Sequence, residues 1–378
     1  MRLARLTASF ACGVALGAVG TMTLKSASEY RIGFALRNRG KLVKANGFGC
    51  AQRWNRTRLV WLVAYAKMAD RRDTPPFACG PENAWHRQAY REIVDGEIVF
   101  VRTGSIRRWV REVLPTIRPA TRRFALVTSD GPRTDYQVPV EVLNTSEADA
   151  LLGHPSLVCW YSTNALDRRV RPLPLGLDLH TRARTGRLLW PQLSTLWRRS
   201  RDALVRRQRT PAEQEAELLE LVRTLPPTAS RRVCAWADFQ FERSNQKRQR
   251  LWRQLRGRHF VVAPSSLMAS RVELWRTKSH ACMFDLSPPG HGFDTHRTWE
   301  SLALGMIPIV LSSPMDDLYE GLPVVLVRSY ADVTEERLRE WAAEAAREAS
   351  ESMGSMRGAV SLRLTLSYWE SKIRAELS

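Results

Sequence analysis

Short apolar runs separated by polar turns recur along the middle of the chain, and they predict the buried strands of a parallel sheet. Residues 98–101, 124–128 and 157–161 form three such runs. Between the first two, residues 106–114 show helical spacing and stop at a proline. Strands that alternate with helices in this way indicate a layered α/β domain.

A second unit begins near Val233 and repeats this alternation. Its best-defined part is an apolar run at 282–286, followed by a glycine-rich turn, a helix and a further apolar run at 307–310. Two units of this kind fit a chain of 378 residues, which is too long for one small core. The pattern also predicts strands at 260–262 and 324–327 and helices at 248–255, 272–278, 335–348 and 366–373.

The region between the two units breaks the pattern. Nine arginines fall between Arg182 and Arg209, and an acidic helix is predicted at 211–221. We interpret this region as a helical insertion or an interdomain linker that ends near Pro226-Pro227. Its basic half is either a face for an anionic acceptor or, more simply, part of a solvated pair of surface helices.

The amino terminus predicts a membrane segment. Residues 6–24 carry no charge, and this uncharged run is just long enough for a helix that spans a bilayer. Arg2 and Arg5 precede this run, so the positive-inside rule keeps the first residues cytosolic and sends the rest of the chain across. An uncleaved signal anchor is the favoured interpretation, and a signal peptide cleaved near Ala18 is the alternative.

Composition narrows the class further. The chain is 44% hydrophobic and 25% charged, which excludes wholesale disorder, and its formal charge of +20 points either to a polyanionic partner or to an arginine-biased genome. Glycosylation triplets begin at Asn55 and Asn144 and suit a secretory lumen. Cys50 and Cys79 are candidates for a disulfide, although pairing cannot be deduced from sequence, and no Cys/His spacing indicates a metal site.

Residues 281–313 carry the clearest chemical signal, a strand, a glycine-rich loop, a helix and a strand. Gly290 and Gly292 are expected to permit positive φ and to let a ligand approach the backbone. Asp294 or Thr295 is expected to cap the helix. Its amino end then lies beside the loop at the carboxyl ends of the strands, where backbone N–H groups and the helix dipole favour a phosphate.

Arg297 and Glu300 are three residues apart on this helix and therefore share a face. Arg297 in the first turn can neutralise a diphosphate, and Glu300 one turn later can accept hydrogen bonds from ribose hydroxyls. The plainer alternative is an Arg–Glu surface pair. The setting between a glycine-rich loop and a buried strand favours the nucleotide interpretation.

The stretch SPPGHGFDTHRTWESLALGMIPIVLSSPMDDLYEGLPVVLV resembles the carboxyl-terminal half of exostosin-type glycosyltransferases, in which a "SPxGxGxDxHRxWEAL" helix precedes a "GxIPIV" strand. Weaker similarity covers VTSDGPRTDYQVP, WYSTNALDRRVRPLPLGL and ERSNQKRQRLW, with Asn164 and Gly176 retained. Arg168 and Arg169 stand where the family often has His-Pro, and Ser244 replaces its usual Thr.

The resemblance implies a GT-B fold, with two Rossmann-like domains facing across a cleft, the donor held by the second and the acceptor by the first. It implies a glycosyltransferase that moves a sugar from a nucleotide donor, expected to be UDP-linked, to a glycan or glycoprotein hydroxyl with inversion. Arginines and helix dipoles would hold the diphosphate without a metal ion. No further cofactor is expected.

Further site residues follow from this interpretation. Arg243 is a second candidate for the donor phosphates or else a surface charge, and His296 and Asp294 are candidates for contacts with the sugar or for loop positions. Asp135 is the chosen catalytic base, although it can equally be a turn residue. His291 and Asp130 are weaker candidates for the base.

The expected location is a Golgi-like membrane, with the chain anchored by its amino-terminal helix and its catalytic part in the lumen. The competing hypothesis is a non-catalytic protein on the same fold that binds polyanions. No nucleic-acid-binding motif is present, and no nucleic acid is expected as a partner. The expected division is an anchor at 1–25, a stem leading into the first domain at 26–90, an acceptor domain at 91–181, a basic and acidic insertion at 182–227, a donor domain at 228–345 and closing helices at 346–378.

Overall fold

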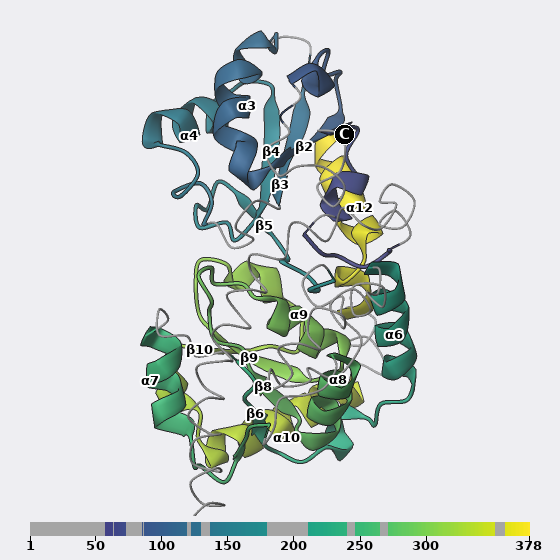
Figure 1. The fold of residues 1–378 in the computed structure, drawn as a ribbon, viewed down its shortest axis with the longest axis vertical. Coiled ribbons are helices and arrows are strands. Elements are labelled where there is room, and N and C mark those ends of the chain that lie inside the picture. Colours follow the sequence, from purple (N-terminus) through teal and green to yellow (C-terminus); the bar gives the residue numbers. More distant parts are fainter. Residues whose placement is uncertain are drawn as a thin grey trace, which may run out of the picture.

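The computed structural model contains two parallel sheets of five strands each, in a mixed α/β arrangement consistent with two Rossmann-like domains (Figure 1). Among the described helices, none has both the length and the apolar character of a bilayer-spanning segment. The expected anchor at 1–25 lies outside the described residues. The structure describes residues 57–62, 64–72, 85, 87–118, 122–129, 137–179, 211–239, 246–264, 271–351 and 360–378.

The first sheet has its strands side by side in chain order, all parallel. The predicted apolar runs form its three central strands, and their alternating side chains supply the cores on both faces of the sheet. Short parallel strands buried on both faces explain why the sequence reads as continuous apolar runs. The strands are β1 (Arg71–Arg72), β2 (Glu97–Arg102), β3 (Phe124–Ser129), β4 (Leu157–Thr163) and β5 (Arg171–Leu173).

Helices cover the two faces of this sheet. Val99 and Leu126 pack in one core with Trp109 of α3 (Ile106–Glu112), whereas Ile98 and Val127 share another core with Trp369 of the C-terminal helix. Helix α12 (Leu366–Leu377) therefore returns from the second unit to lie on the first sheet (Figure 1). Among the described residues of this unit, α4 (Thr145–Leu152) is the other α-helix.

Helix α4 is an element that sequence reasoning missed. Asn144, noted only as a glycosylation acceptor, is its N-cap, and Asn144 Oδ1 accepts a hydrogen bond from the Glu147 backbone N–H at 2.8 Å. Glu147 reaches back to the Asn144 N–H and completes a capping box. The other triplet, at Asn55, lies outside the described residues.

The second sheet has the order β10-β9-β8-β6-β7, again all parallel. The chain runs from β6 outward to β7 and then crosses to β8 on the other side of β6. The strand order thus reverses between β6 and β8, which defines the topological switch point of the sheet. The strands are β6 (Ala235–Trp236), β7 (Val261–Val262), β8 (Phe284–Leu286), β9 (Ile307–Leu311) and β10 (Val325–Val327).

Within the described residues, helices α6 to α10 belong to this half of the molecule (Figure 1). The acidic helix predicted between the units is partly buried rather than a solvated surface helix, because Glu215 accepts hydrogen bonds from the Arg58 and Leu59 N–H groups. The expected basic partner of this helix lies outside the described residues. The helices are α6 (Pro211–Arg223), α7 (Gln246–Leu255), α8 (Arg271–Ala281), α9 (His296–Ala303) and α10 (Glu335–Glu351).

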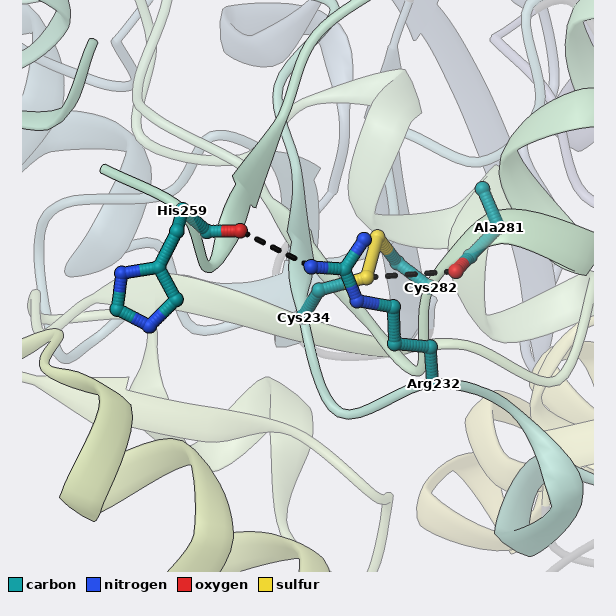
Figure 2. The surroundings of a disulfide bond; sticks show 5 residues. All are labelled: Arg232, Cys234, His259, Ala281 and Cys282. Carbon is teal, nitrogen blue, oxygen red and sulfur yellow. Dashed lines mark hydrogen bonds between the residues drawn. A yellow bond between two sulfur atoms is a disulfide. The ribbon is translucent and has the colours of Figure 1, made fainter. Parts of the chain in front are cut away.

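A disulfide joins Cys234 and Cys282, whose Cα atoms are 5.0 Å apart (Figure 2). The two residues precede β6 and β8, so the bond ties together the amino ends of the two strands that flank the switch point. Disulfides persist mainly in oxidising compartments. The candidate pair Cys50 and Cys79 lies outside the described residues.

Candidate functional site

The carboxyl edges of the two sheets face each other. Asn164 directly follows β4, and its Oδ1 accepts a hydrogen bond from the Asp294 N–H at 2.9 Å. The Leu175 N–H, just after β5, donates to Asp294 Oδ2 at 2.6 Å, and His296 Nδ1 donates to the Gly176 carbonyl at 2.7 Å. These contacts between the two units are called the junction below. Ligands of open α/β sheets bind outside the carboxyl ends of strands, so the ligand-binding edges of both sheets meet at the junction.

Asp294 is the centre of this junction. Its carboxylate also accepts hydrogen bonds from Trp299 Nε1 at 2.8 Å, Tyr319 Oη at 3.0 Å and the Thr295 N–H at 2.8 Å. Burial raises the pKa of Asp294, and the bond from Leu175 is the largest of the opposing effects. The residue is only 2% exposed and the N-cap of α9 is Thr295, so Asp294 fixes the start of the helix and joins the units.

The glycine-rich loop also contacts this junction, through Gly292. The expectation that its glycines adopt positive φ was wrong. Neither Gly290 nor Gly292 has a positive φ. A Cβ at Gly292 would lie 2.5 Å from the Asn164 side chain, so this glycine admits a neighbouring side chain of the first unit. Arg248 holds the loop from the other side, because it donates to the Pro289 carbonyl at 2.8 Å.

Gly292→Ala is expected to lower the free energy of unfolding by about 1–3 kcal/mol, because the new methyl group overlaps Asn164. Gly290→Ala is the matched control, since its Cβ would meet only an Arg248 nitrogen at 3.4 Å. Urea unfolding of both variants measures the difference. Equal stability of the two would contradict the close contact between Gly292 and Asn164.

Arg297 lies at the switch point of the second sheet. It belongs to the first turn of α9, which follows β8, and its Nε donates to Asp238 Oδ1 at 2.6 Å. Asp238 lies two residues beyond the end of β6. The ion pair therefore spans the carboxyl ends of the two strands between which the strand order reverses.

Asp238 holds only one of the three guanidinium nitrogens of Arg297. Within the described part of the chain, only Nε of this guanidinium makes a hydrogen bond, and 15% of the side chain is exposed. Burial lowers the pKa of Arg297, but Asp238 and Asp285 outweigh that effect and raise it. Arg297 is thus a fixed cation whose terminal amino groups can take a bidentate anion.

A buried ion pair inside the second unit adds a negative charge that interacts with Arg297. Lys278 Nζ lies 2.8 Å from Asp285 Oδ2, and their side chains are 1% and 0% exposed. Ser301 of α9 completes the cluster, because its Oγ accepts from Lys278 at 3.0 Å and donates to Asp285. Burial lowers the pKa of Lys278, but Asp285 and the nearby Asp238 and Glu300 raise it above its ordinary value, so the lysine stays charged.

Glu300 points into the protein and not along the surface. It forms an ion pair with Arg271 of α8, and it accepts from Trp275 Nε1 at 3.2 Å. Since Arg297 pairs with Asp238 instead, the alternative of an Arg297–Glu300 surface pair does not fit. The cluster balances three cations against three carboxylates, namely Arg271, Lys278 and Arg297 with Glu300, Asp285 and Asp238.

Two predicted site residues, Asp135 and Arg243, lie outside the described residues. Among the described residues, no group of three or more His, Cys, Asp or Glu side chains is placed to hold a metal ion. His296 lies at the junction, as its bond to Gly176 shows. Of the predicted donor residues, the structure thus brings together Asp294, His296, Arg297 and Glu300 on or beside one turn of α9, next to the loop that contains Gly290 and Gly292.

Sequence reasoning missed the partners of these residues. Asp285 carried a usable signal, because a carboxylate inside the apolar run 282–286 requires a buried counterion. Asp238, Arg271 and Lys278 carried none, since they lie outside the 281–313 segment, Asp238 after β6 and the other two on α8. No protein-family model matches this chain, and no curated protein matches it. The chemistry of the site is therefore argued from its geometry.

Proposed function

We propose that the protein is a metal-independent glycosyltransferase of GT-B architecture, with its nucleotide-sugar donor bound at the carboxyl edge of the second sheet. The observation that carries the proposal is Arg297, a largely buried guanidinium that Asp238 fixes at the switch point and whose terminal amino groups make no hydrogen bond within the described residues. The amino end of α9 adds to the attraction of a diphosphate, because the N-cap Thr295 makes no capping hydrogen bond within the described residues.

The proposed donor is a UDP-sugar. Arg297 holds its diphosphate, and Arg243 contributes a second positive charge. Glu300 is largely buried beside Arg271, but 12% of its side chain is exposed, and we propose that it accepts from the ribose hydroxyls there, since a carboxylate can accept about four hydrogen bonds. Gly292, Asp294 and His296 shape the site by joining the loop and the helix to the first unit, which is the proposed acceptor side. Gly290 lies in the same loop next to Arg248 and is proposed to let the donor approach the backbone.

The proposed reaction is an inverting displacement at the anomeric carbon. An acceptor hydroxyl oxygen forms the new bond to this carbon, and the bond from the carbon to the diphosphate oxygen breaks, so UDP leaves with the electron pair. Asp135 takes the proton of the hydroxyl as general base. Arg297 and the α9 dipole stabilise the charge that develops on the leaving diphosphate.

The proposed setting is a secretory lumen, with a Golgi membrane anchor at the amino terminus. The Cys234–Cys282 disulfide supports an oxidising compartment. Glycans and glycoproteins with free hydroxyls are the proposed acceptors.

A thermal-shift screen with EDTA present tests the donor site. UDP at about 100 times its Kd should stabilise the protein by about 2.7 kcal/mol, and uridine, which lacks the diphosphate, should have much less effect. ATP, GDP and CMP identify the preferred base. If no nucleotide shifts the melting temperature, the proposal is contradicted and the polyanion-binding hypothesis is left. A shift that requires Mg²⁺ would contradict metal independence.

A further inference from the structure

Tyr330 carries a buried hydroxyl group just beyond the carboxyl end of β10. Val327 is the last residue of that strand, and Tyr330 opens the short 3₁₀ helix that follows it. The residue is 9% exposed, and its ring packs in the core of the second unit together with Leu251 of α7 and Ile309 of β9. Because this packing fixes the ring, it also fixes the position of the hydroxyl.

Two arginines lie near enough to this hydroxyl to act on its pKa. Burial raises the pKa of Tyr330 above its ordinary value, and the charges of Arg248 and Arg297 lower it by less. The phenol therefore stays protonated at neutral pH and can donate a hydrogen bond. Arg297 is the proposed ligand of the diphosphate, and Arg248 holds the Pro288 and Pro289 carbonyls of the glycine-rich loop. The hydroxyl thus belongs to the surroundings of the proposed donor site.

The hydrogen of this hydroxyl has no acceptor among the described residues, where the buried Tyr330 Oη makes no hydrogen bond. The Leu311 N–H at the end of β9 also lowers the pKa of Tyr330, but an N–H group is a donor and cannot accept this hydrogen. Asp285 is near enough to raise the same pKa, but the hydrogen bonds that its carboxylate accepts come from Lys278 and Ser301. A buried donor without an acceptor costs free energy, so the position suits an acceptor that a ligand supplies.

We propose that the Tyr330 hydroxyl donates a hydrogen bond to a phosphate oxygen of the donor nucleotide. A phosphate oxygen accepts hydrogen bonds, and its negative charge is attracted by both Arg248 and Arg297, which act on this hydroxyl. Hydrogen bonds to an ionised acceptor are also shorter and stronger than those between neutral groups. A carbonyl of the base or a hydroxyl of the sugar would gain much less from the two cations. The inference rests on the proposed donor site and adds to it a neutral donor next to Arg297.

The test is Tyr330→Phe in the full chain, which removes the hydroxyl and keeps the ring. The affinity for UDP, measured by calorimetry with EDTA present, should fall about 10-fold to 100-fold. The affinity for inorganic pyrophosphate should fall by a similar factor, because the lost contact is to phosphate. The melting temperature without ligand should stay the same or rise, since the variant no longer buries a donor without an acceptor.

Tyr90→Phe is the matched control. Tyr90 is also buried, but its Oη donates to the Phe100 carbonyl at 3.0 Å within the first unit. Loss of this satisfied hydrogen bond should lower the melting temperature and leave the affinity for UDP unchanged. The two variants therefore separate a hydroxyl that serves a ligand from one that serves the fold.

Failure of the inference can be told apart from failure of the proposed function. An unmodified protein that does not bind UDP would contradict both. Normal UDP binding by Tyr330→Phe, when the unmodified protein binds UDP, would overturn only the role of Tyr330. Weaker UDP binding with unchanged pyrophosphate binding would overturn the contact to phosphate and move it to the base or the ribose. A lower melting temperature of unliganded Tyr330→Phe would show that the hydroxyl has a partner within the protein, which also overturns the inference.

Discussion

Arg297→Ala is expected to weaken UDP binding by about 100-fold to 1000-fold and to reduce sugar transfer by at least as much. The substitution removes a cation that can donate two charge-assisted hydrogen bonds to the diphosphate, each worth about 1.5–3 kcal/mol. The loss should appear both in the Kd for UDP, measured by calorimetry, and in kcat, because the leaving group becomes more negative as the bond breaks.

Three controls separate a binding role of Arg297 from a structural one. Arg297→Lys keeps the charge but lacks the planar fork, so it should show an intermediate loss. Arg337→Ala removes an exposed arginine of the same unit and should leave UDP binding unchanged. Thermal unfolding without ligand detects damage from the loss of the Asp238 pair. A folded Arg297→Ala protein that binds UDP normally would contradict the assignment.

Lys278→Met is expected to lower the free energy of unfolding by about 3–5 kcal/mol, because it leaves the buried Asp285 carboxylate without its counterion. Methionine fills a similar volume, so the loss reports charge more than packing. Guanidinium unfolding at neutral pH measures this change.

The matched variant combines Lys278→Met with Asp285→Leu. Removing both groups leaves no unpaired charge of this pair, so the double variant should recover much of the stability that the single variant loses. A double variant as unstable as the single one would show that the stability at this position depends on shape and not on the ion pair.

The pattern of apolar runs was enough to predict the three central strands of the first sheet, every strand of the second sheet except β6, and most of the described helices, because burial on both faces leaves a continuous signal. The two-residue strands β1 and β6 and the three-residue β5 were not predicted. None of these three strands contains a run of β-branched residues like Val261–Val262 of β7, and only pairing with a neighbouring strand defines them.

The candidate site was predictable only in part. Helical spacing predicted Arg297 in the first turn of a helix and Glu300 one turn later, and both residues lie on α9. Their partners Asp238 and Arg271 are 59 and 29 residues away, and the sheet topology alone brings them together. The role of Gly292 was misjudged for the same reason, because the side chain that it accommodates belongs to the other unit.

The most direct test of the central claim is a crystal structure of the protein with UDP bound in the presence of EDTA. The account predicts the diphosphate at the amino end of α9, within hydrogen-bond distance of the Arg297 terminal amino groups and between the carboxyl ends of β6 and β8. A diphosphate bound elsewhere, or one that reaches the protein only through a metal ion, would contradict it.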